Sequence, residues 1–475
     1  MDKRPLWTAQ ELIGATGGSL HGQIPVAMNG VSLDSRATEP GDIFVAVKGD
    51  KLDGHDYVVR ALENGASVAI VSQATDAMSK AGAILQVSGD PLQALQNIGR
   101  AARAWSPAQI IAVTGSVGKT STKEMLRIAL GASGDTHASA ASFNNHWGVP
   151  LTLARLPRGA TYGIFEIGMN HAGEITPLVN MVRPHIAVVT SVAASHLGHF
   201  NSLDEIADAK AEIFSGVEPG GSAVINQDSP YFEKLAAIAR KFDIKSVIGF
   251  GHHADAGVRM ERLSLHHNCC CVTADIMGEK VTYKLGVPGA HMAMNSLAVL
   301  ATVKLAGADL ARAALALAHA KPFKGRGIQE RLEANGGEIL LIDESYNANP
   351  ASVAAALSLL GHARLGKHGR RIAVLGDMLE LGQFAPALHA DIAPALEEHH
   401  VDLLYAAGPL MNHLWENTPE AMRGAYAENS GELKDRLLKD IRAGDCIVIK
   451  GSLGSRMGLL VDALRTQFTA VKKES

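Results

Sequence analysis

The sequence is poor in cysteine and in aromatic residues, and no long apolar run interrupts it. Its 475 residues include four cysteines, and aromatic residues make up 5% of the chain. Three cysteines are consecutive, at Cys269, Cys270 and Cys271, so their side chains alternate in direction along an extended segment. Because this spacing suits neither a zinc site nor a disulfide framework, we expect reduced thiols.

The chain also lacks a strong excess of either charge. It has 44 basic and 48 acidic residues, a formal net charge of -4, which argues against a global attraction to nucleic acid or to an anionic membrane. Residues 1–7 lack the apolar stretch of a signal peptide, and no apolar run reaches membrane length. We therefore predict a cytoplasmic protein with no membrane span and no nucleic-acid partner, and we take it to be a monomer.

The length and the element pattern predict an α/β fold in about three domains. Short apolar strands alternate with helical patterns throughout, which is typical of parallel sheets. Pro107 marks one boundary, and a basic hinge containing glycine and proline at 321–327 marks another. We predict domains at residues 1–107, 108–322 and 323–475.

A glycine-rich turn between an apolar strand and a helix carries the clearest functional signal. The strand covers 110–114, and we expect a helix over 121–130. The glycines let backbone N–H groups approach phosphate oxygens, and the helix directs its positive end at the same anion. Lys119 would reach the terminal phosphates, while the hydroxyl of Thr120 would hold magnesium. Val113 stands where the general motif has its first glycine, which favours a subclass of nucleotide-binding enzymes.

Two polar residues follow strands of the same predicted sheet. Glu166 interrupts the apolar run at 164–167, where a buried carboxylate needs a partner or a metal ion, and magnesium is the natural partner beside a phosphate loop. A bond to a neighbouring loop is the alternative. His196 follows the strand at 186–192 and so lies at the same edge of the sheet. A loop histidine is more often a surface residue, and His199 competes with it for any role.

Lys210 falls on the inward face of a predicted helix. Ser202 and Glu205 predict a capping box at its start, and the apolar positions then share a face with Lys210. Burial would lower the lysine pKa, and the neutral amine could react with carbon dioxide to form a carbamate that faces a metal. A lysine that reaches the surface, or that pairs with Asp208 or Glu212, explains the periodicity equally well.

Three segments of the predicted C-terminal domain place polar groups directly after apolar strands. They are 342–350, 375–382 and the segment that begins at Lys450. Strand ends of this kind face ligands in parallel sheets, but aspartate, serine and asparagine also cap helices well. Lys450 repeats the strand-to-helix geometry that binds anions.

These motifs, in this order and over essentially the whole chain, resemble the Mur ligase family. The resemblance rests on the turn at 114–120, Asn144-Asn145 with Gly148-Val149-Pro150, Glu166 to Asn170, His196, Ala209 to Phe214, Asn295, Arg326 and Asp343 to Pro350. Residues 347–350 and the absence of an Asp-Asn-Pro-Arg motif favour the dipeptide-adding branch over the diaminopimelate-adding one. Glu344 stands where many relatives have a second aspartate, and it retains the charge.

The resemblance implies an N-terminal UDP-binding α/β domain, a central phosphate-loop ATPase domain with a parallel sheet, and a C-terminal Rossmann-like domain. It implies that ATP and Mg²⁺ are used to join D-alanyl-D-alanine to UDP-N-acetylmuramoyl-tripeptide through an acyl phosphate. Another amide ligase of this architecture, of the Mur or folylpolyglutamate type, is one alternative. A phosphate-loop NTPase that forms no bond is another.

The resemblance also assigns roles to single residues. The implied catalytic residues are Lys119, Glu166, His196, Lys210, Arg326 and Asp343, with Lys210 at the carbamylated position. The implied nucleotide contacts are Thr114, Gly115, Ser116, Val117, Gly118, Lys119, Thr120, Asn295, Arg326, Asp343 and Asn347. Metal would be held by Thr120, Glu166 and His196. With the C-terminal loops included, the expected substrate contacts are Ser35, Arg36, Asn144, Asn145, Asp377 and Lys450.

Overall fold

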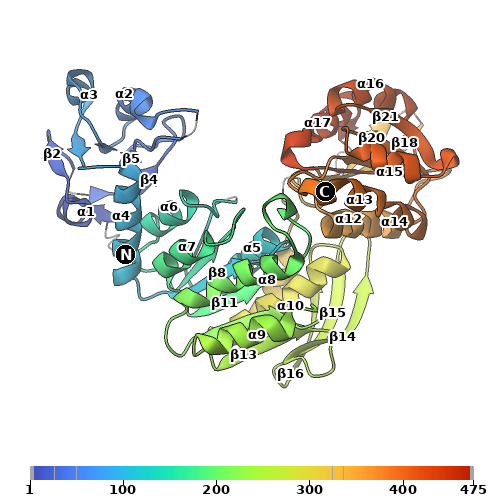
Figure 1. Cartoon of the computed structure of the whole chain (residues 1–475), viewed down its shortest axis with the longest axis horizontal. Helices are drawn as coiled ribbons and strands as arrows, with labels where there is room; N and C mark the ends of the chain where they lie inside the picture. Colours follow the sequence, from blue (N-terminus) through green and yellow to red (C-terminus); the bar gives the residue numbers. More distant parts are fainter. Residues whose placement is uncertain are drawn as a thin grey trace.

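The computed structural model describes residues 5–25, 27–49, 51–140, 142–323, 325–334 and 336–470. The start of the chain and Lys324 of the predicted hinge lie outside this range. Sheets of five, nine and seven strands and a two-stranded ribbon succeed one another along the chain, and helices flank the three larger sheets (Figure 1). The α/β class and the three-unit architecture expected from the sequence are confirmed.

The N-terminal unit is a small sheet covered by helices. Its strands run in the order β2-β7-β6-β5-β4, parallel except for the β2–β7 pair, and β1 pairs with β3 separately. The elements are β1 (Trp7–Thr8), α1 (Ala9–Thr16), β2 (Ser19–His21), β3 (Ala27–Met28), β4 (Gly30–Ser32), β5 (Asp42–Val45), α2 (Val58–Glu63), β6 (Val68–Val71), α3 (Asp76–Ala81), β7 (Ile84–Gln86) and α4 (Pro91–Trp105).

The central unit is a nine-stranded sheet in the order β16-β15-β14-β13-β12-β11-β8-β10-β9. All pairs from β9 across to β14 are parallel, whereas β15 and β16 continue the sheet beyond β14 as antiparallel strands, an extension that the sequence did not predict. Alternate residues of β8 face two apolar cores, Ile110 toward one and Ile111 toward the other. The strands are β8 (Gln109–Thr114), β9 (Thr136–Ala138), β10 (Tyr162–Glu166), β11 (Ile186–Val189), β12 (Ser222–Asn226), β13 (Ser246–Gly251), β14 (Val258–Leu265), β15 (Cys270–Ile276) and β16 (Glu279–Leu285).

Helices cover both faces of the central sheet, as the alternation of apolar residues requires. They are α5 (Lys119–Gly131), α6 (Gly148–Ala154), α7 (Ile175–Val182), α8 (Leu203–Ala211), α9 (Phe232–Lys241), α10 (Ala290–Leu305) and α11 (Leu310–Ala316). Ser202 caps α8 through the N–H of Glu205, but the Glu205 carboxylate accepts from the N–H of Asn201 instead of Ser202. The predicted capping box is therefore half formed.

The C-terminal unit is a mostly parallel sheet in the order β21-β20-β19-β22-β18-β17-β23, with antiparallel pairs at the β17 edge. Its elements are β17 (Ile328–Ala334), β18 (Gly337–Glu344), α12 (Pro350–His362), β19 (Arg371–Gly376), α13 (Ala385–Ala390), α14 (Ala393–Glu398), β20 (Leu403–Ala407), α15 (Met411–Asn417), β21 (Arg423–Ala427), α16 (Ser430–Asp440), β22 (Cys446–Lys450), α17 (Gly458–Gln467) and β23 (Thr469–Ala470).

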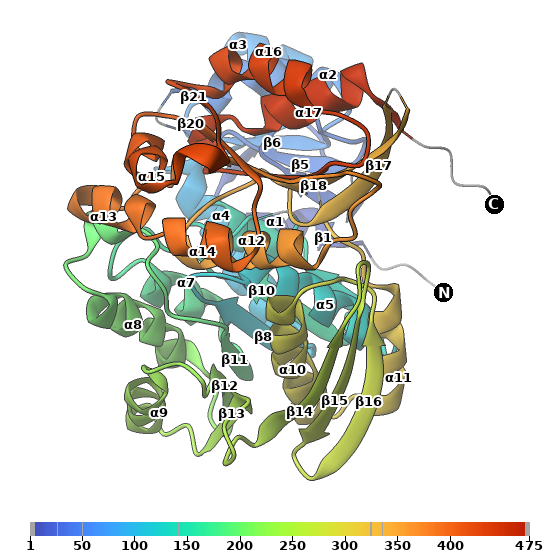
Figure 2. The same cartoon turned by 90° about the vertical axis from the view of Figure 1, so that its right-hand side faces the viewer.

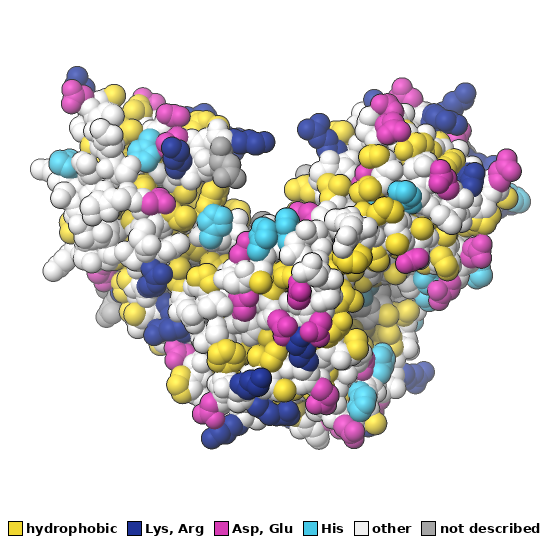
Figure 3. Space-filling view, in the orientation of Figure 1, with side chains coloured by type: hydrophobic (Ala, Val, Ile, Leu, Met, Phe, Trp, Pro, Cys, Tyr) yellow, Lys and Arg dark blue, Asp and Glu magenta, His cyan; other side chains and the backbone are white. Residues whose placement is uncertain are grey.

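The N-terminal and C-terminal units rise from opposite ends of the central unit, and a wide cleft separates them (Figure 3). The N-terminal unit packs on α6, where the indole N–H of Trp7 donates to the carbonyl of Ala154 at 2.8 Å. On the other side, one apolar cluster includes buried residues of both the central and the C-terminal units. In the view of Figure 2 the C-terminal unit lies directly above the central one.

Two predictions from composition are also tested by the structure. The four cysteines are free, with Cys270 and Cys446 buried, so the prediction of reduced thiols is confirmed. Among the described residues, no helix is both long and apolar enough to cross a membrane.

Candidate functional site

The turn between β8 and α5 places two glycines where side chains do not fit. Gly115 has a φ of 149° and Gly118 a φ of 88°. A Cβ on Gly115 would lie 2.0 Å from Oγ1 of Thr190, and a Cβ on Gly118 would lie 2.8 Å from the side-chain amide of Asn295. Glycine is therefore needed at both positions. The turn leads directly into the N-terminus of α5, which is the geometry of an anion site.

Lys119 begins α5 and folds back over the turn. Its Nζ donates a hydrogen bond to the carbonyl oxygen of Gly115 at 2.6 Å. Burial lowers the pKa of Lys119, the neighbouring Glu166 carboxylate raises it, and the Arg326 guanidinium lowers it again. A lysine held in this way lies where the outer phosphates of a bound nucleotide would require a cation.

Glu166 ends β10 with its carboxylate beside the turn. Oε1 accepts hydrogen bonds from Oγ1 of Thr120 at 3.2 Å and from Nδ2 of Asn144 at 2.7 Å. Oε2 is buried and receives no hydrogen bond from any described residue. An unsatisfied buried carboxylate oxygen is costly, and together with a threonine hydroxyl it is a donor pair that Mg²⁺ prefers. Thr120 and Glu166 therefore fit a metal ion.

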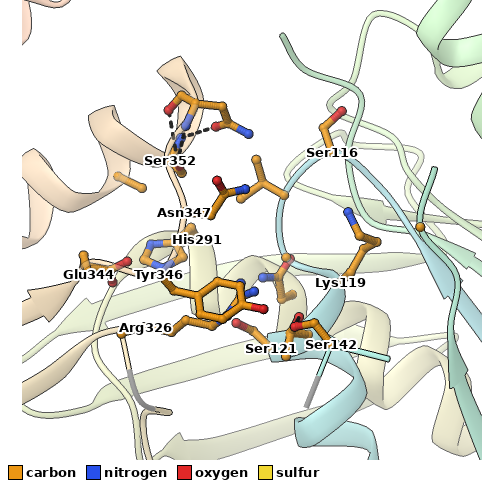
Figure 4. A pocket seen from close by; sticks show the side chains of 18 of the residues that line it. Ser116, Lys119, Ser121, Ser142, His291, Arg326, Glu344, Tyr346, Asn347 and Ser352 are labelled. Carbon is orange, nitrogen blue, oxygen red and sulfur yellow. Dashed lines mark hydrogen bonds between the residues drawn. The ribbon is translucent and has the colours of Figure 1, made fainter. Parts of the chain in front are cut away.

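The turn and Glu166 open into a cavity of about 300 Å³ between the central and C-terminal units. In Figure 4, Ser116 and Lys119 rise from the central unit, and Tyr346 and Asn347 face them from the C-terminal unit. The cavity is also lined by Val117, Gly118, Thr120, Ser121, Ser142, Asn144, His196, His291, Asn295, Arg326, Glu344, Asn349, Ser352 and Lys450. Most of the nucleotide and metal contacts expected from the sequence thus lie around one space.

Two further cations border this cavity on the C-terminal side. The Arg326 guanidinium lies over the Tyr346 ring, 4.3 Å from its centroid. Nζ of Lys450 donates to the carbonyl of Asn347 at 2.8 Å and lies 3.5 Å from a carboxylate oxygen of Glu344. Burial lowers the pKa of Lys450, and the nearby Glu344 carboxylate partly offsets this by raising it. Three cations and a helix N-terminus around one cavity suit a polyanionic ligand such as a nucleoside triphosphate.

Comparisons with known proteins agree with this geometry over the whole chain. Residues 27–118 match the model of the Mur ligase family catalytic domain, 113–303 that of the Mur ligase middle domain, and 330–453 that of the Mur ligase glutamate ligase domain. A UDP-N-acetylmuramoyl-tripeptide--D-alanyl-D-alanine ligase of Rickettsia prowazekii is 32% identical, with 96% of this chain and 99% of that protein covered. The chain belongs to the Mur ligase family.

Other relatives of this Mur ligase carry the same name. The Escherichia coli (strain K12) protein of that name is 32% identical, with 97% of this chain and 99% of that protein covered. A crystal structure of MurF from Acinetobacter baumannii superposes with a TM-score of 0.84 at 30% identity and covers 97% of this chain and 99% of that one. The resemblance to the family that the sequence motifs predicted is confirmed.

Lys210 of this Mur ligase is buried, with 2% of its surface exposed. The alternatives of a surface lysine or a pair with its helix neighbours are wrong, because Asp208 pairs with Lys234 at 2.8 Å and Glu212 accepts from backbone N–H groups just before and in the first turn of α7. Burial, and then the charge of Lys119, lower the pKa of Lys210 well below its usual value. A fraction of neutral amine follows, as carbamylation requires.

Of the two competing histidines, the structure brings His196 to the cavity. His196 is partly buried and lines it. His199 is exposed and lies against the His171 ring, with 4.2 Å between ring centroids. The described residues contain no cluster of three histidine, cysteine or acidic side chains suited to a metal. A metal at Glu166 and His196 would therefore need a further ligand, and a carbamate would add one.

Several predicted site residues engage neighbours outside this cavity. Asn145 accepts from the N–H of Gly148 and so caps the start of α6, and Asp377 accepts from the N–H of Met411 at the start of α15. Burial raises the pKa of Asp377. The bond of Asp377 matches the capping alternative given for its segment, and a substrate role for either residue stays a prediction.

Asp343 faces a second cavity of about 710 Å³ that shares Arg326 and Tyr346 with the first. Its carboxylate accepts from Ser345 at 2.6 Å and lies 3.3 Å from Arg465. In the N-terminal unit, Ser35 is buried, and the exposed Arg36 pairs with Asp34 at 2.8 Å, away from both cavities. Their assigned roles stay predictions.

Sequence reasoning missed Ser142, His291 and Ser352, all of which line the cavity. His291 lies four residues before Asn295 on α10, so the two share a helix face, and this spacing could have identified it. Burial lowers the pKa of His291. Ser352 completes the capping box of Asn349. Nothing in the sequence distinguishes Ser142.

Proposed function

We propose that this Mur ligase uses ATP to join D-alanyl-D-alanine to UDP-N-acetylmuramoyl-tripeptide in peptidoglycan precursor synthesis, with release of ADP and phosphate. One observation carries the proposal: the phosphate-binding turn and the loops of the C-terminal unit face each other across one cavity. Similarity along nearly the full length to relatives that bear this name supports the substrate pair. A cytoplasmic monomer remains a prediction.

The cationic side chains at the cavity would reduce the repulsion between the two anions that react. The tripeptide carboxylate attacks the γ-phosphorus, the bond to ADP breaks, and an acyl phosphate forms; the dipeptide amine then displaces phosphate and an amide remains. Two anions must meet at one phosphorus atom, which is unfavourable without nearby positive charge. Lys119 and Arg326 lie at the cavity and would stabilise the transferring group as charge moves to ADP.

The remaining residues would hold the metal and the nucleotide. Magnesium, when bound, would neutralise the phosphate oxygens. Thr120, Glu166 and His196 would hold it, and Lys210 would add a carbamate formed from its neutral amine and carbon dioxide with loss of a proton. Asn295 lies beside Gly118 and would contact the adenine region.

The position of the C-terminal unit supports a role in the second step. Its loops at Tyr346, Asn347 and Lys450 form the far wall of the cavity. Closure against the phosphate-binding turn would exclude water, which would otherwise hydrolyse the acyl phosphate, and would bring the amine to the carbonyl carbon.

Phosphate release tests the proposal directly. The protein is incubated with ATP, Mg²⁺ and UDP-N-acetylmuramoyl-tripeptide, with and without D-alanyl-D-alanine, and the nucleotide-linked product is weighed by mass spectrometry. We expect dipeptide-dependent release and a product heavier by the dipeptide less one water. Equal release without any acceptor would indicate an NTPase, whereas release that depends on a single amino acid or on a folate would indicate another ligase of this architecture.

A further inference from the structure

His196 and Glu380 meet where the central and C-terminal units touch. His196 lies in the loop after β11, and Glu380 lies in the loop after β19. Nδ1 of His196 is 2.5 Å from Oε2 of Glu380, which is an ion-pair contact, although the direction of the ring N–H does not meet hydrogen-bond geometry. The backbone N–H of Gly198 also donates to the carbonyl oxygen of Glu380 at 2.8 Å. In Figure 2 the green loop before α8 reaches up to the region of α13 in the C-terminal unit.

The backbone at this contact adopts conformations that most residues avoid. His196 has a φ of 58°, Glu380 a φ of 64° and Gly382 a φ of 56°. A Cβ on Gly382 would lie 2.7 Å from Cα of Gly198, so the two loops approach as closely as glycine allows. A left-handed conformation costs a non-glycine residue about 1–2 kcal/mol, and it persists only where the surroundings impose it.

The loop that carries Glu380 is itself held by buried hydrogen bonds. The N–H of Met378 donates to Nε2 of His389 at 3.0 Å, and the N–H of Leu379 donates to Oγ of Ser452 at 2.9 Å. His389 is fully buried, and its Nδ1 faces the carbonyl of Ala385 at 2.6 Å. The backbone next to Glu380 is therefore held in place, and its half-exposed side chain reaches His196 from there.

This arrangement matches the way proteins orient metal-binding histidines. A histidine that binds a metal through one ring nitrogen almost always holds its other nitrogen against a carboxylate, carbonyl or water, which sets the tautomer and the ring orientation. With Nδ1 against Glu380, Nε2 is the nitrogen left to face an ion. His196 lines the same cavity as Glu166 and Thr120.

We propose that Glu380 of the C-terminal unit is a positioning residue that orients His196 for metal binding. The metal site proposed above would then be complete only while the C-terminal unit is docked, which couples domain position to phosphoryl transfer. This inference rests on the metal role of His196 in the proposed function.

Manganese binding distinguishes a failure of the positioning role of Glu380 from a failure of the metal role of His196. Mn²⁺ alone is titrated into the full-length protein, and free Mn²⁺ is followed by electron paramagnetic resonance for the native chain, Glu380→Ala, His196→Ala and the double variant. We expect each single variant to raise the Kd for Mn²⁺ about 10-fold or more. The double variant should bind no more weakly than His196→Ala, because both changes act through one ligand. Glu398→Ala, at an exposed carboxylate of α14, is the matched control and should bind as the native chain does.

Three results would overturn the inference. Native affinity in Glu380→Ala with weak binding in His196→Ala would remove the positioning role and leave the metal role intact. Native affinity in His196→Ala would remove both. If the double variant binds Mn²⁺ more weakly than His196→Ala does, Glu380 affects metal binding by a route other than His196, such as the stability of the fold. Thermal melting of each variant checks that the comparison is made on folded protein.

Discussion

Replacement of Lys119 by methionine tests the electrostatic argument most directly. Methionine retains an unbranched side chain but removes the ammonium. Lys119 is half-buried at the edge of the cavity, and its hydrogen bond among the described residues goes to a backbone carbonyl, so an apolar side chain of similar length should fit in its place. We therefore expect a folded protein with a melting temperature close to the native one and with severely reduced ligation.

The expected fall in kcat follows from the Coulomb energy between the Lys119 ammonium and the charge on the γ-phosphate. Two unit charges ~4 Å apart interact by ~4 kcal/mol at an effective dielectric constant of ~20. Because most of this interaction is needed as charge develops on the γ-phosphate, we expect the activation free energy to rise by about 3–4 kcal/mol. That corresponds to a fall in kcat of about 100- to 1,000-fold.

The assay is the release of ADP and phosphate with both substrates at saturation, with the ligated product confirmed by mass. Lys241→Met, at an exposed lysine that ends α9, is the matched control and should keep native turnover. A kcat for Lys119→Met within about fivefold of native, in a folded protein, would refute the role of the turn in phosphate binding.

Three further changes test other parts of the structure. Lys210→Ala should be nearly inactive and partly rescued by short carboxylates in a turnover assay, since these would replace the carbamate; full activity without rescue would refute the carbamate. Gly118→Ala should lower the free energy of unfolding by about 1–3 kcal/mol and weaken ADP binding in calorimetry, because the new Cβ would meet the Asn295 amide and φ is 88°; native values for both would contradict this. Burial lowers the pKa of His389, so as the pH falls the unfolded chain takes up a proton at this residue before the folded chain does. Urea unfolding should therefore show a free energy of unfolding that decreases as the pH drops below about 6.5. His389→Asn should make that dependence shallower, and an unchanged slope would show that His389 does not contribute.

Local patterns predicted the elements that frame the site. The strand expected at 110–114 is β8 (Gln109–Thr114), and the helix expected over 121–130 is α5 (Lys119–Gly131), so both lie within two residues of their expected bounds. These elements have strong apolar periodicity or clear caps, which depend on neighbours in sequence. The burial of Lys210 was predicted in the same way, because periodicity shows which helix face is turned inward.

Local patterns do not decide between two uses of the same residue. Asparagine and aspartate bind ligands or cap helices with the same atoms: the oxygens of Asn145 and Asp377 accept from helix N-termini, and a substrate role for either residue stays a prediction. The antiparallel extension β14–β16 was missed because its pairing depends on register between strands, which short apolar runs do not specify.

The sequence by itself determined the chemistry that each segment can perform. The glycine turn, the lysine and threonine that follow it, and the inward lysine of α8 are encoded within a few residues of one another, because phosphate binding and helix burial are local geometries. Only the tertiary structure decided which segments meet. The pairing of His196 with Glu380 and the unsatisfied oxygen of Glu166 depend on how separate sheets pack, and residues far apart in the chain carry no local signal of that contact.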